Sequence, residues 1–588
     1  MIPTTAPSDL HPGRDARMTD AHVLAGIVVD ELVRNGVRCF LYCPGSRNGP
    51  LGFELARRAQ NRDLVLHVRL DERVAGFTAL GMAKSTGSPV AVVTTSGSAV
   101  TNLLPGATEA NYSDVPVIVL SANRPVSVLG TGASQTIEQI EALHSQVRGS
   151  MQITPEGADT ATINASIRST VCRAVLTGRG HLAAPAGPVH LDLPLASALP
   201  PTQFEPDIPA GKPDGAPWVV HPADHGSAPS AEPHQLHPRS LVIAGDGANP
   251  NLLPAGIPVV AEPTVPLRAD QPRLHPWVLD YVTPEEVVVA GRPTLHRNVT
   301  RTMRHPGVWA SYLRDGNEQW LYAAADLDAV VTTVALPETR DDEWDQHLAT
   351  VDQTIRDAWA TALSDPSVQA CGAQVVSSVV ATVPSSELLW LGASNTIRDA
   401  ALIARELPQT TLSNRGTAGI DGTIASALGV ALAHPDRHVT AVLGDLTFLY
   451  DATALQFGHH EQIPANLTLV VINDQGGGIF ELLEQGAPEY KQPPYAATFE
   501  RIYGTPQDVS IKGLCQAYRT QHRVADLAGL PHALRDQHAK GLSVIEVTAA
   551  RGHLRDLHAC ARERVESSQS NQTPPTSPTF TPPGGTRP

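Results

Sequence analysis

The stretch VTAVLGDL, residues 439–446, decides the fold class of this chain, because an apolar β-rich run leads directly into a Gly-Asp turn. A strand-to-helix turn of this kind presents backbone N–H groups and the positive end of a helix dipole to a phosphate. A helical stretch is expected from Asp451. A second apolar run, 467–472, ends in Asn473-Asp474-Gln475-Gly476, twenty-eight residues after Asp445. We therefore predict that two adjacent strand ends share a phosphate-binding edge.

Oxygen donors at these two strand ends suit Mg²⁺. The carboxylate of Asp445, the side chain of Asp474 or Asn473 and the carbonyl of Gly476 would join diphosphate oxygens in the octahedral geometry that this ion prefers. A Gly-Asp turn alone is more often an ordinary helix cap. The chain offers a control in Gly245-Asp246-Gly247, which has Leu274 and His275 at the same spacing, and we interpret it as a structural turn.

The rest of the chain predicts an α/β architecture. At 588 residues it is too long for one core, and about 150 residues per domain suggests three or four domains. Apolar runs alternate with helical stretches, which is typical of parallel sheets covered on both faces. The expected strands are 38–42, 64–70, 90–95, 117–121 and 189–193; then 241–244, 259–261, 286–290 and 329–334; then 388–391, 410–413, 439–443, 467–472 and 544–547.

These strands fall into three consecutive parallel-sheet domains. The predicted limits are an extension 1–17, a first domain 18–200, a linker 201–239, a central domain 240–337, a helical bridge 338–367, a third domain 368–566 and a tail 567–588. Both ends are expected to be disordered, because they are polar and rich in turn-forming residues. The first and third domains are alike in size and layout, although no sequence repeat links them.

Composition excludes several classes of protein. The net charge of −16 argues against nucleic acid as the main partner. No apolar run is long enough to predict a membrane span, and the start of the chain lacks the apolar core of a secretory signal. The six cysteines are scattered without a CxxC pair, which favours free thiols and a cytoplasmic location. The basic residues are mostly arginine, which reflects either base composition or carboxylate ligands.

A carboxylate in the first domain has two interpretations. The strand expected at 64–70 ends in Asp71-Glu72-Arg73, and a helical stretch follows from Val74 to Lys84. An isolated triplet of this kind is more often a surface salt-bridge cluster. A half-buried carboxylate at a strand end is also a good general acid or base.

The two sites together resemble those of thiamine-diphosphate enzymes. In that class a Gly-Asp-Gly turn and a later amide pair hold the metal and the diphosphate; here Leu446 replaces the second glycine and Asp474 replaces an asparagine. The resemblance makes Glu72 the carboxylate that sets the tautomer of the aminopyrimidine. It also implies the pyruvate-decarboxylase-like fold, with a pyrimidine-binding first domain, a diphosphate-binding third domain and an active site across a subunit interface. The smallest active unit would be a homodimer, and a homotetramer is left open.

Further motifs resemble the 2-succinyl-5-enolpyruvyl-6-hydroxy-3-cyclohexene-1-carboxylate (SEPHCHC) synthase family over roughly residues 18–555. The matching stretches are Cys43-Pro44-Gly45-Ser46-Arg47, Leu70-Asp71-Glu72-Arg73, Thr95-Ser96-Gly97-Ser98-Ala99, Ala122-Asn123-Arg124-Pro125, Gly132-Ala133-Ser134-Gln135, Ser413-Asn414-Arg415-Gly416, Gly419-Ile420-Asp421-Gly422, Gly444-Asp445-Leu446 and Gly476-Gly477-Gly478-Ile479-Phe480. Ser134 departs from the family, which commonly has asparagine there.

The resemblance implies a reaction of menaquinone biosynthesis. 2-Oxoglutarate is decarboxylated on thiamine diphosphate, CO₂ is released, and the succinyl carbanion adds in a 1,4 fashion to isochorismate, with Mg²⁺ or Mn²⁺ as the anchoring metal. Carried over by position, the cofactor-binding residues are Glu72, Ile420, Gly444, Asp445, Leu446, Asp474 and Gly476, of which Asp445, Asp474 and Gly476 bind the metal. The substrate-binding residues are Ser46, Arg47, Arg124, Gln135, Ser394, Arg398, Arg415, Ile479 and Phe480.

Two alternatives stay open at this point. One is another thiamine enzyme, such as a 2-oxoacid decarboxylase or a carboligase with a different acceptor. The other is a non-catalytic relative that acts as a binding subunit, against which the intact Glu72 and Asp445 argue.

Overall fold

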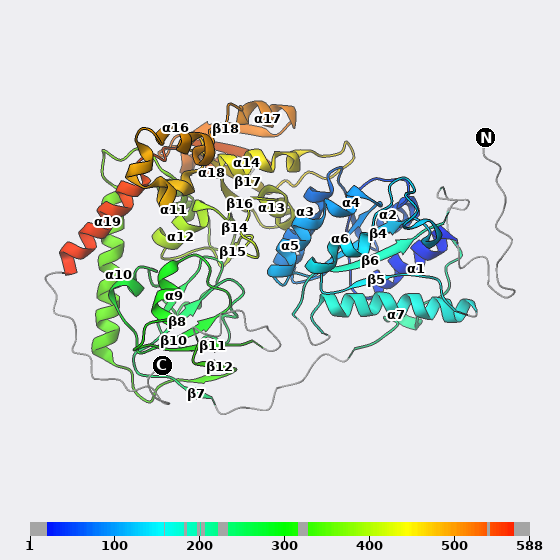
Figure 1. The fold of residues 1–588 in the computed structure, drawn as a ribbon, viewed down its shortest axis with the longest axis horizontal. Helices are drawn as coiled ribbons and strands as arrows, with labels where there is room; N and C mark the ends of the chain where they lie inside the picture. The colour runs from blue at the N-terminus through cyan, green and yellow to red at the C-terminus, as the bar shows by residue number, and fades with distance from the viewer. Residues whose placement is uncertain are drawn as a thin grey trace. The chain divides into compact units, whose positions relative to one another are not determined.

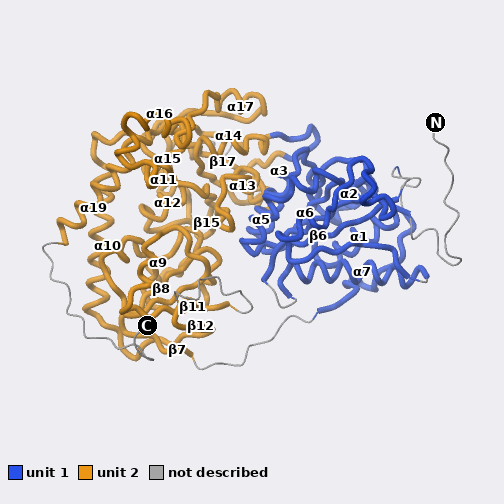
Figure 2. Tube along the Cα trace, in the orientation of Figure 1, with its two compact units in different colours: residues 1–225, 456–462 blue, residues 226–455, 463–588 orange. Residues whose placement is uncertain are grey.

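The computed structural model describes residues 20–157, 159–181, 185–196, 200, 206–221, 233–315, 327–537 and 541–569. The predicted extension 1–17, parts of the predicted linker and residues 570–588 of the predicted tail lie outside the described residues. The chain forms two compact units, one of residues 1–225 with 456–462 and one of residues 226–455 with 463–588 (Figure 2). Because one unit holds two of the three larger sheets, the limits of three separate domains stay a prediction.

The first unit is built on a six-stranded parallel sheet of order β2-β1-β3-β4-β6-β5. Figure 1 labels its strands β4, β5 and β6. Its strands are β1 (Cys39–Tyr42), β2 (Val65–Val68), β3 (Val90–Thr94), β4 (Val117–Asn123), β5 (Ser150–Gln152) and β6 (Val189–Pro194). Its helices are α1 (Ala21–Arg34), α2 (Gly49–Gln60), α3 (Glu72–Thr86), α4 (Ser98–Thr101), α5 (Leu104–Tyr112), α6 (Gln139–Leu143) and α7 (Thr160–Gly178).

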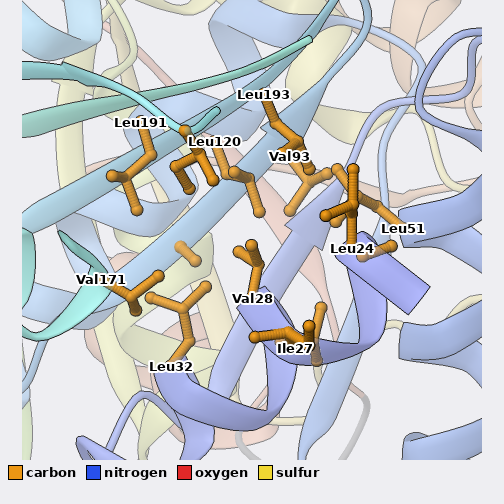
Figure 3. Packing of buried hydrophobic residues seen from close by; sticks show 14 of the residues in the cluster. Leu24, Ile27, Val28, Leu32, Leu51, Val93, Leu120, Val171, Leu191 and Leu193 are labelled. Carbon is orange, nitrogen blue, oxygen red and sulfur yellow. The ribbon is translucent and has the colours of Figure 1, made fainter. Parts of the chain in front are cut away.

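The core of this unit lies between the sheet and helices α1, α2 and α7. Leu24, Ile27 and Val28 of α1 belong to one buried cluster with Val93 and Leu120 of the sheet (Figure 3). The helix α1 begins where Asp20 accepts the His22 N–H at 2.7 Å, a side-chain cap that satisfies a donor the helix leaves unpaired. The helix α3 packs across β1, β3 and β4 outside this core, so helices cover both faces of the sheet, as the apolar strands predicted.

A short segment from late in the chain, residues 456–462, completes the edge of this unit. Glu461 accepts the backbone N–H of Val68 at 2.8 Å, at the end of the edge strand β2. The guanidinium of Arg69 lies 4.2 Å from the ring centre of Phe457 and donates to the Gln456 carbonyl at 3.2 Å. The segment therefore holds the strand end that leads to Glu72.

The second unit contains two larger parallel sheets. The five-stranded sheet has the order β12-β11-β10-β8-β9, and the six-stranded sheet has the order β15-β14-β16-β17-β19-β18. The five-stranded sheet and its short neighbouring pair comprise β7 (His234–Gln235), β8 (Ser240–Ala244), β9 (Val259–Ala261), β10 (Glu286–Ala290), β11 (Trp309–Leu313), β12 (Ala329–Val331) and β13 (Val334–Ala335). The six-stranded sheet comprises β14 (Leu388–Leu391), β15 (Thr410–Leu412), β16 (Val439–Gly444), β17 (Leu467–Asn473), β18 (Gln521–Ala525) and β19 (Ser543–Thr548).

Helices join and cover these two sheets. They are α8 (Val278–Tyr281), α9 (Arg297–Met303), α10 (Asp342–Leu363), α11 (Gly372–Thr382), α12 (Asn395–Ile403), α13 (Thr423–Ala433), α14 (Asp445–Tyr450), α15 (Gly478–Leu482), α16 (Ala496–Phe499), α17 (Ile511–Ala517), α18 (Leu530–Gln537) and α19 (Leu554–Gln569). The predicted bridge is the long helix α10, whose Trp344 and Trp359 are buried in a core shared with the five-stranded sheet and α19. None of the described helices is long and apolar enough to cross a membrane.

The parallel α/β fold class is confirmed, and the two six-stranded sheets have the same strand order relative to their sequence numbering. The predicted first and third domains are thus alike in sheet topology. The helix expected from Asp451 was placed wrongly, because α14 begins at Asp445 itself and ends at Tyr450. The strands β5, β7, β11 and β18 were not predicted. All six cysteines are free thiols, as expected.

Candidate active site

A pocket of about 350 Å³ lies at the carboxyl ends of β14, β16 and β17 in the second unit. Ten of the eleven site residues predicted in this unit line it: Ser394, Arg398, Ile420, Gly444, Asp445, Leu446, Asp474, Gly476, Ile479 and Phe480. The eleventh, Arg415, lies behind this lining and is 2% exposed. Folding therefore brings together residues that stand more than eighty positions apart in the sequence, while their functional roles stay predictions.

Asp445 is placed by the strand end that the sequence predicted. It is the first residue of α14 and only 5% exposed. Its Oδ1 accepts the Leu446 N–H at 2.7 Å. Burial raises the pKa of the Asp445 carboxyl, although the N–H groups of Leu446 and Gly476 act in the opposite direction. A carboxylate in so buried a place is stabilised by a cation.

Two further aspartates, Asp474 and Asp399, line the pocket. Burial and the charge of Asp445 raise the pKa of Asp474 to about 7, while Arg551 opposes the shift. Burial and the charge of Asp474 raise the pKa of Asp399, on α12, to about 8. Because these carboxylates repel one another, the pocket suits a ligand that brings positive charge.

Asn473 and Asp474 point to different places, as neighbouring residues at a strand end do. The Nδ2 of Asn473 donates to Glu546 on β19 at 2.7 Å, and its Oδ1 accepts the Gln475 N–H at 3.3 Å. Asp474 lines the pocket. Of the two ligand candidates that the sequence left open, the geometry favours Asp474.

Gly476 must be glycine for a conformational reason. Its φ is +142°, a region that other residues rarely adopt. A Cβ at this position would lie 2.1 Å from the Gly504 carbonyl oxygen. The Gly477 N–H donates to the same oxygen at 2.8 Å, so the turn after β17 is held close to Asp445.

Two arginines lie beside the carboxylates. Arg398, on α12, donates to the Ser394 carbonyl at 2.8 Å. Ser394 is the N-cap residue of α12, and within the described residues its hydroxyl makes no capping hydrogen bond. Arg415 donates from Nη2 to the Thr294 hydroxyl at 2.5 Å. Burial lowers the pKa of Arg398 and the charge of Arg415 lowers it further, so an anion between them would relieve their repulsion.

The predicted carboxylate of the first unit stands at a helix start. Glu72 is the first residue of α3, whose N-cap Asp71 accepts the Arg73 N–H at 2.9 Å. The Oε2 of Glu72 accepts from the Asn102 amide at 3.4 Å. Burial raises the pKa of the Cys43 thiol, and the charges of Glu72 and Asp71 raise it further. The Pro-Gly-Ser-Arg turn therefore lies beside Glu72, as two motifs of one site should.

The arginines predicted in the first unit also lie near each other. Burial lowers the pKa of Arg47, and the charge of Arg124 lowers it further. Arg47 donates to the Leu195 carbonyl at 3.1 Å. The Nε atoms of both arginines are buried without a hydrogen-bond partner among the described residues. Ser46, next to Arg47, is exposed. This group could receive a carboxylate.

Gln135 is held by a reciprocal contact with Ser96. Its φ is +60°, and its Nε2 donates to the Ser96 carbonyl at 2.9 Å. The Ser96 hydroxyl donates back to the Gln135 carbonyl at 3.0 Å. The amide oxygen of Gln135 is therefore the end that is left for a substrate.

One buried carboxylate that the sequence did not predict organises these segments. Asp192, on β6, is fully buried and accepts hydrogen bonds from Ser121, Asn123, Gln139 and Gln152 at 2.8 to 3.0 Å. Asn123 in turn accepts the Arg124 N–H at 2.8 Å, and Gln139 accepts the Gly97 N–H at 3.1 Å. Asp192 therefore fixes the segment that carries Arg124 and, through Gln139, the family motif that contains Gly97.

Comparison with known proteins agrees with this division into two half-sites. Residues 23–142 match the family described as "Thiamine pyrophosphate enzyme, N-terminal TPP binding domain", and residues 393–547 match "Thiamine pyrophosphate enzyme, C-terminal TPP binding domain". The first range contains Glu72, and the second contains the pocket residues from Ala393 to Phe480. The chain therefore has the thiamine-diphosphate-binding fold.

Relatives named 2-succinyl-5-enolpyruvyl-6-hydroxy-3-cyclohexene-1-carboxylate synthase match nearly the whole chain. One from Nocardia farcinica (strain IFM 10152) is 44% identical over 556 residues, which cover 93% of this chain and 100% of the relative. One from Rhodococcus opacus (strain B4) is 43% identical with the same coverage. One from Mycobacterium sp. (strain KMS) is 44% identical over 557 residues, 92% of this chain and 99% of the relative. The chain belongs to the SEPHCHC synthase family.

The pocket fits thiamine diphosphate with a divalent metal. A Cβ placed on Gly444 would meet no atom within 4 Å, so the turn before α14 leaves room for a diphosphate. Within the described residues no group of three or more His, Cys, Asp or Glu side chains is arranged as a metal site. The donor set that fits is instead two carboxylates, Asp445 and Asp474, with a backbone carbonyl, as Mg²⁺ bound to a phosphate uses.

The sequence did not predict Asp399, Glu262, Thr294 or Asp192 as parts of the site. Glu262 and Thr294 follow β9 and β10 and reach Arg415 from the five-stranded sheet. Asp399 stands next to Arg398 in the sequence, and that spacing was the one available signal. The others belong to no local pattern, because only the packing of separate sheets brings them together.

Proposed function

We propose that this member of the family decarboxylates 2-oxoglutarate and joins the remaining succinyl unit to isochorismate, with release of CO₂, in menaquinone biosynthesis. The observation that carries the proposal is the pocket in which the Gly444-Asp445 turn, Asp474 and the arginine pair adjoin. Thiamine diphosphate, when bound, supplies the carbon that attacks the oxoacid and takes up the electrons of the lost carboxylate. The chain supplies orientation, charge and a shape that excludes water.

Asp445, Asp474 and the Gly476 carbonyl would hold Mg²⁺ or Mn²⁺, and the Gly444 and Leu446 backbone would receive the diphosphate. The repulsion between Asp445 and Asp474 supports this assignment, because a divalent cation between them would remove it. Ile420 would support the bent cofactor from the apolar side of the pocket.

Replacing Asp474 and Asn473 separately by alanine tests which of the two binds the metal. We expect Asp474→Ala to raise the Mg²⁺ concentration for half-maximal activity by more than the roughly 10–100-fold typical of indirect contacts. Asn473→Ala should change it little, because its side chain is committed to Glu546. Titration of activity and of thiamine-diphosphate binding with Mg²⁺ measures both. The reverse order of effects would assign the metal to Asn473.

The substrates fit the arginine-bearing sites by charge, because both are dianions. Arg398 and Arg415 with Ser394 would hold substrate carboxylates and hydroxyls in the second unit. Arg47 and Arg124, with Ser46 and Gln135, would do so in the first. Ile479 and Phe480 would form the apolar wall; the Phe480 ring lies 5.3 Å from that of Tyr503, which limits its movement.

Glu72 and the pocket belong to different compact units, and we propose that the working site forms between two copies of the chain. Glu72 would hydrogen-bond to the aminopyrimidine and set its tautomer. The assembly would be a homodimer or a homotetramer, which sedimentation at micromolar concentration distinguishes. We also propose a cytoplasmic location, in line with six free thiols.

The proposed reaction has a direct assay. The holoenzyme with thiamine diphosphate and Mg²⁺ is expected to consume isochorismate only when 2-oxoglutarate is also present, with one CO₂ released per isochorismate lost. Decarboxylation of 2-oxoglutarate or pyruvate while isochorismate persists would support a different thiamine enzyme. No turnover of any oxoacid would support a binding protein.

A further inference from the structure

A cluster of charged groups lies behind the pocket, at the carboxyl edge of the five-stranded sheet. Glu262 follows β9 and is 5% exposed. Its Oε1 accepts the backbone N–H of Leu295 at 2.7 Å and that of Thr294. The Thr294 hydroxyl accepts from Arg415 at 2.5 Å. Thr294 therefore connects the buried glutamate to a predicted substrate-binding arginine.

Two buried atoms of this cluster have no hydrogen-bond partner among the described residues. One is the acceptor Oε2 of Glu262, and the other is the donor Nε of Arg415. Buried polar atoms are rarely left in this state in native proteins. One is an acceptor and the other a donor, so each can still form a hydrogen bond with a ligand.

The charges explain why a glutamate is needed here. Arg415 and Arg398 repel each other when no anion lies between them, and Glu262 favours the charged form of Arg398. Arg415 in turn favours the ionised form of Glu262. A substrate carboxylate at the arginine pair would offer the same compensation as Glu262, so the two anions oppose each other.

We infer that Glu262 is a positioning residue for Arg415: it fixes the loop that carries Thr294, and its negative charge compensates Arg415 until a substrate carboxylate takes that place. The inference rests on the proposed function, because it requires Arg415 to hold a substrate. It gives the central sheet a role in substrate affinity.

The inference has a consequence for pH. Burial raises the pKa of Glu262 to about 7, the charge of Asp246 raises it further, and Arg415 with the two backbone N–H groups opposes the shift. The groups that face Glu262 are thus Arg415, Arg398 and Asp246. The pKa of the neighbouring His296 is lowered to about 4, so it stays neutral in the range that matters. Below pH 7 Glu262 is protonated and leaves Arg415 to the substrate; above pH 7 its charge competes, so KM should rise.

Glu262→Gln separates charge from position, because the amide oxygen can still accept both N–H groups. KM and kcat for each substrate are measured from pH 6 to 8.5 on the holoenzyme. If binding of a substrate carboxylate raises the pKa of Glu262 by one unit, the KM of the native enzyme for that substrate should rise about tenfold across this range. In Glu262→Gln, KM should no longer rise with pH, and kcat should stay at the native value. An unaltered pH profile of KM, or a loss confined to kcat, would overturn the inference.

Two further variants test the role of Thr294 and control for a general effect of losing a buried glutamate. Thr294→Val retains the charge of Glu262 but removes the acceptor of Arg415, and it should raise KM at every pH while keeping the slope. KM at the native level in this variant would also overturn the inference. Glu286→Gln is the matched control, because Glu286 is a buried glutamate at the opposite end of the same sheet that accepts the His237 N–H at 2.7 Å.

The control must keep the native pH profile; if Glu286→Gln flattens it as well, the effect belongs to the sheet as a whole and the inference fails. A failure of the proposed function would look different. It would appear in the native holoenzyme as isochorismate that is not consumed, before any variant is compared.

Discussion

Glu72→Gln is expected to lower kcat by roughly 10²–10⁴-fold, the range that a positioned acid or base contributes. Glutamine keeps the size of the side chain and can still accept from Asn102, which contacts Glu72 at 3.4 Å, but it cannot carry the charge that favours the reactive tautomer of the aminopyrimidine. The helix start at Asp71 should be unaffected. Steady-state kinetics of isochorismate consumption at saturating cofactor measures the loss.

Glu109→Gln is the control for this substitution. Glu109 is a buried glutamate on α5 of the same unit, and it accepts from the Ser113 hydroxyl at 2.9 Å. We expect this variant to keep native kcat. Circular dichroism and thiamine-diphosphate binding should be unchanged in both variants. Native activity in Glu72→Gln would remove Glu72 from its proposed role.

Asp445→Ala is expected to weaken retention of thiamine diphosphate and Mg²⁺ by well over the roughly 10–100-fold that indirect contacts to a metal cost. Asp445 is 5% exposed at the start of α14, directly after the strand β16. Its loss would remove a proposed metal ligand and the charge that would offset the cation. Calorimetric titration of the apoenzyme with cofactor and Mg²⁺ gives both affinities.

The same sequence motif elsewhere in the chain provides the control. Asp246 stands in a literal Gly-Asp-Gly turn after β8 and pairs with Arg292 at 3.8 Å. A Cβ on Gly245 would lie 2.0 Å from the Pro293 nitrogen, so that turn is closed by protein and leaves no space for a phosphate. Asp246→Ala should therefore retain native cofactor affinity. Equal losses in the two variants would contradict the assignment of Asp445.

Strands with continuous apolar runs were predicted well, whereas the polar β18, the short β5 and the buried but mixed sequence of β11 were missed. The apolar runs that became β9, β10 and β14 have the predicted limits. The missed strand β18, QHRVA, is an edge strand with a polar sequence, and β5 has three half-buried residues at the other sheet's edge. An edge strand gains most of its stability from its neighbour, so its own sequence need not be apolar.

Site residues could be predicted where they belong to a local sequence motif. They could not be predicted where only the packing of separate elements brings them together. Asp445 and Asp474 stand at strand ends with a characteristic spacing, and a parallel sheet brings such ends to one edge. The preference for Asp474 over Asn473 needed the Glu546 contact, which no sequence pattern shows. Glu262 follows an unremarkable apolar run, and its relation to Arg415 arises only from the packing of two sheets.

The late position of segment 456–462 in the sequence affects when the first unit can finish folding during translation. Residues 1–225 leave the ribosome long before Phe457 and Glu461 do, so the nascent first unit has an Arg69 side chain without the ring and carbonyl that later hold it. The end of β2 is likewise unfinished until Glu461 accepts the Val68 N–H. The strand end that leads to Glu72 is thus completed late in translation, which delays the first half-site until most of the second has been synthesised.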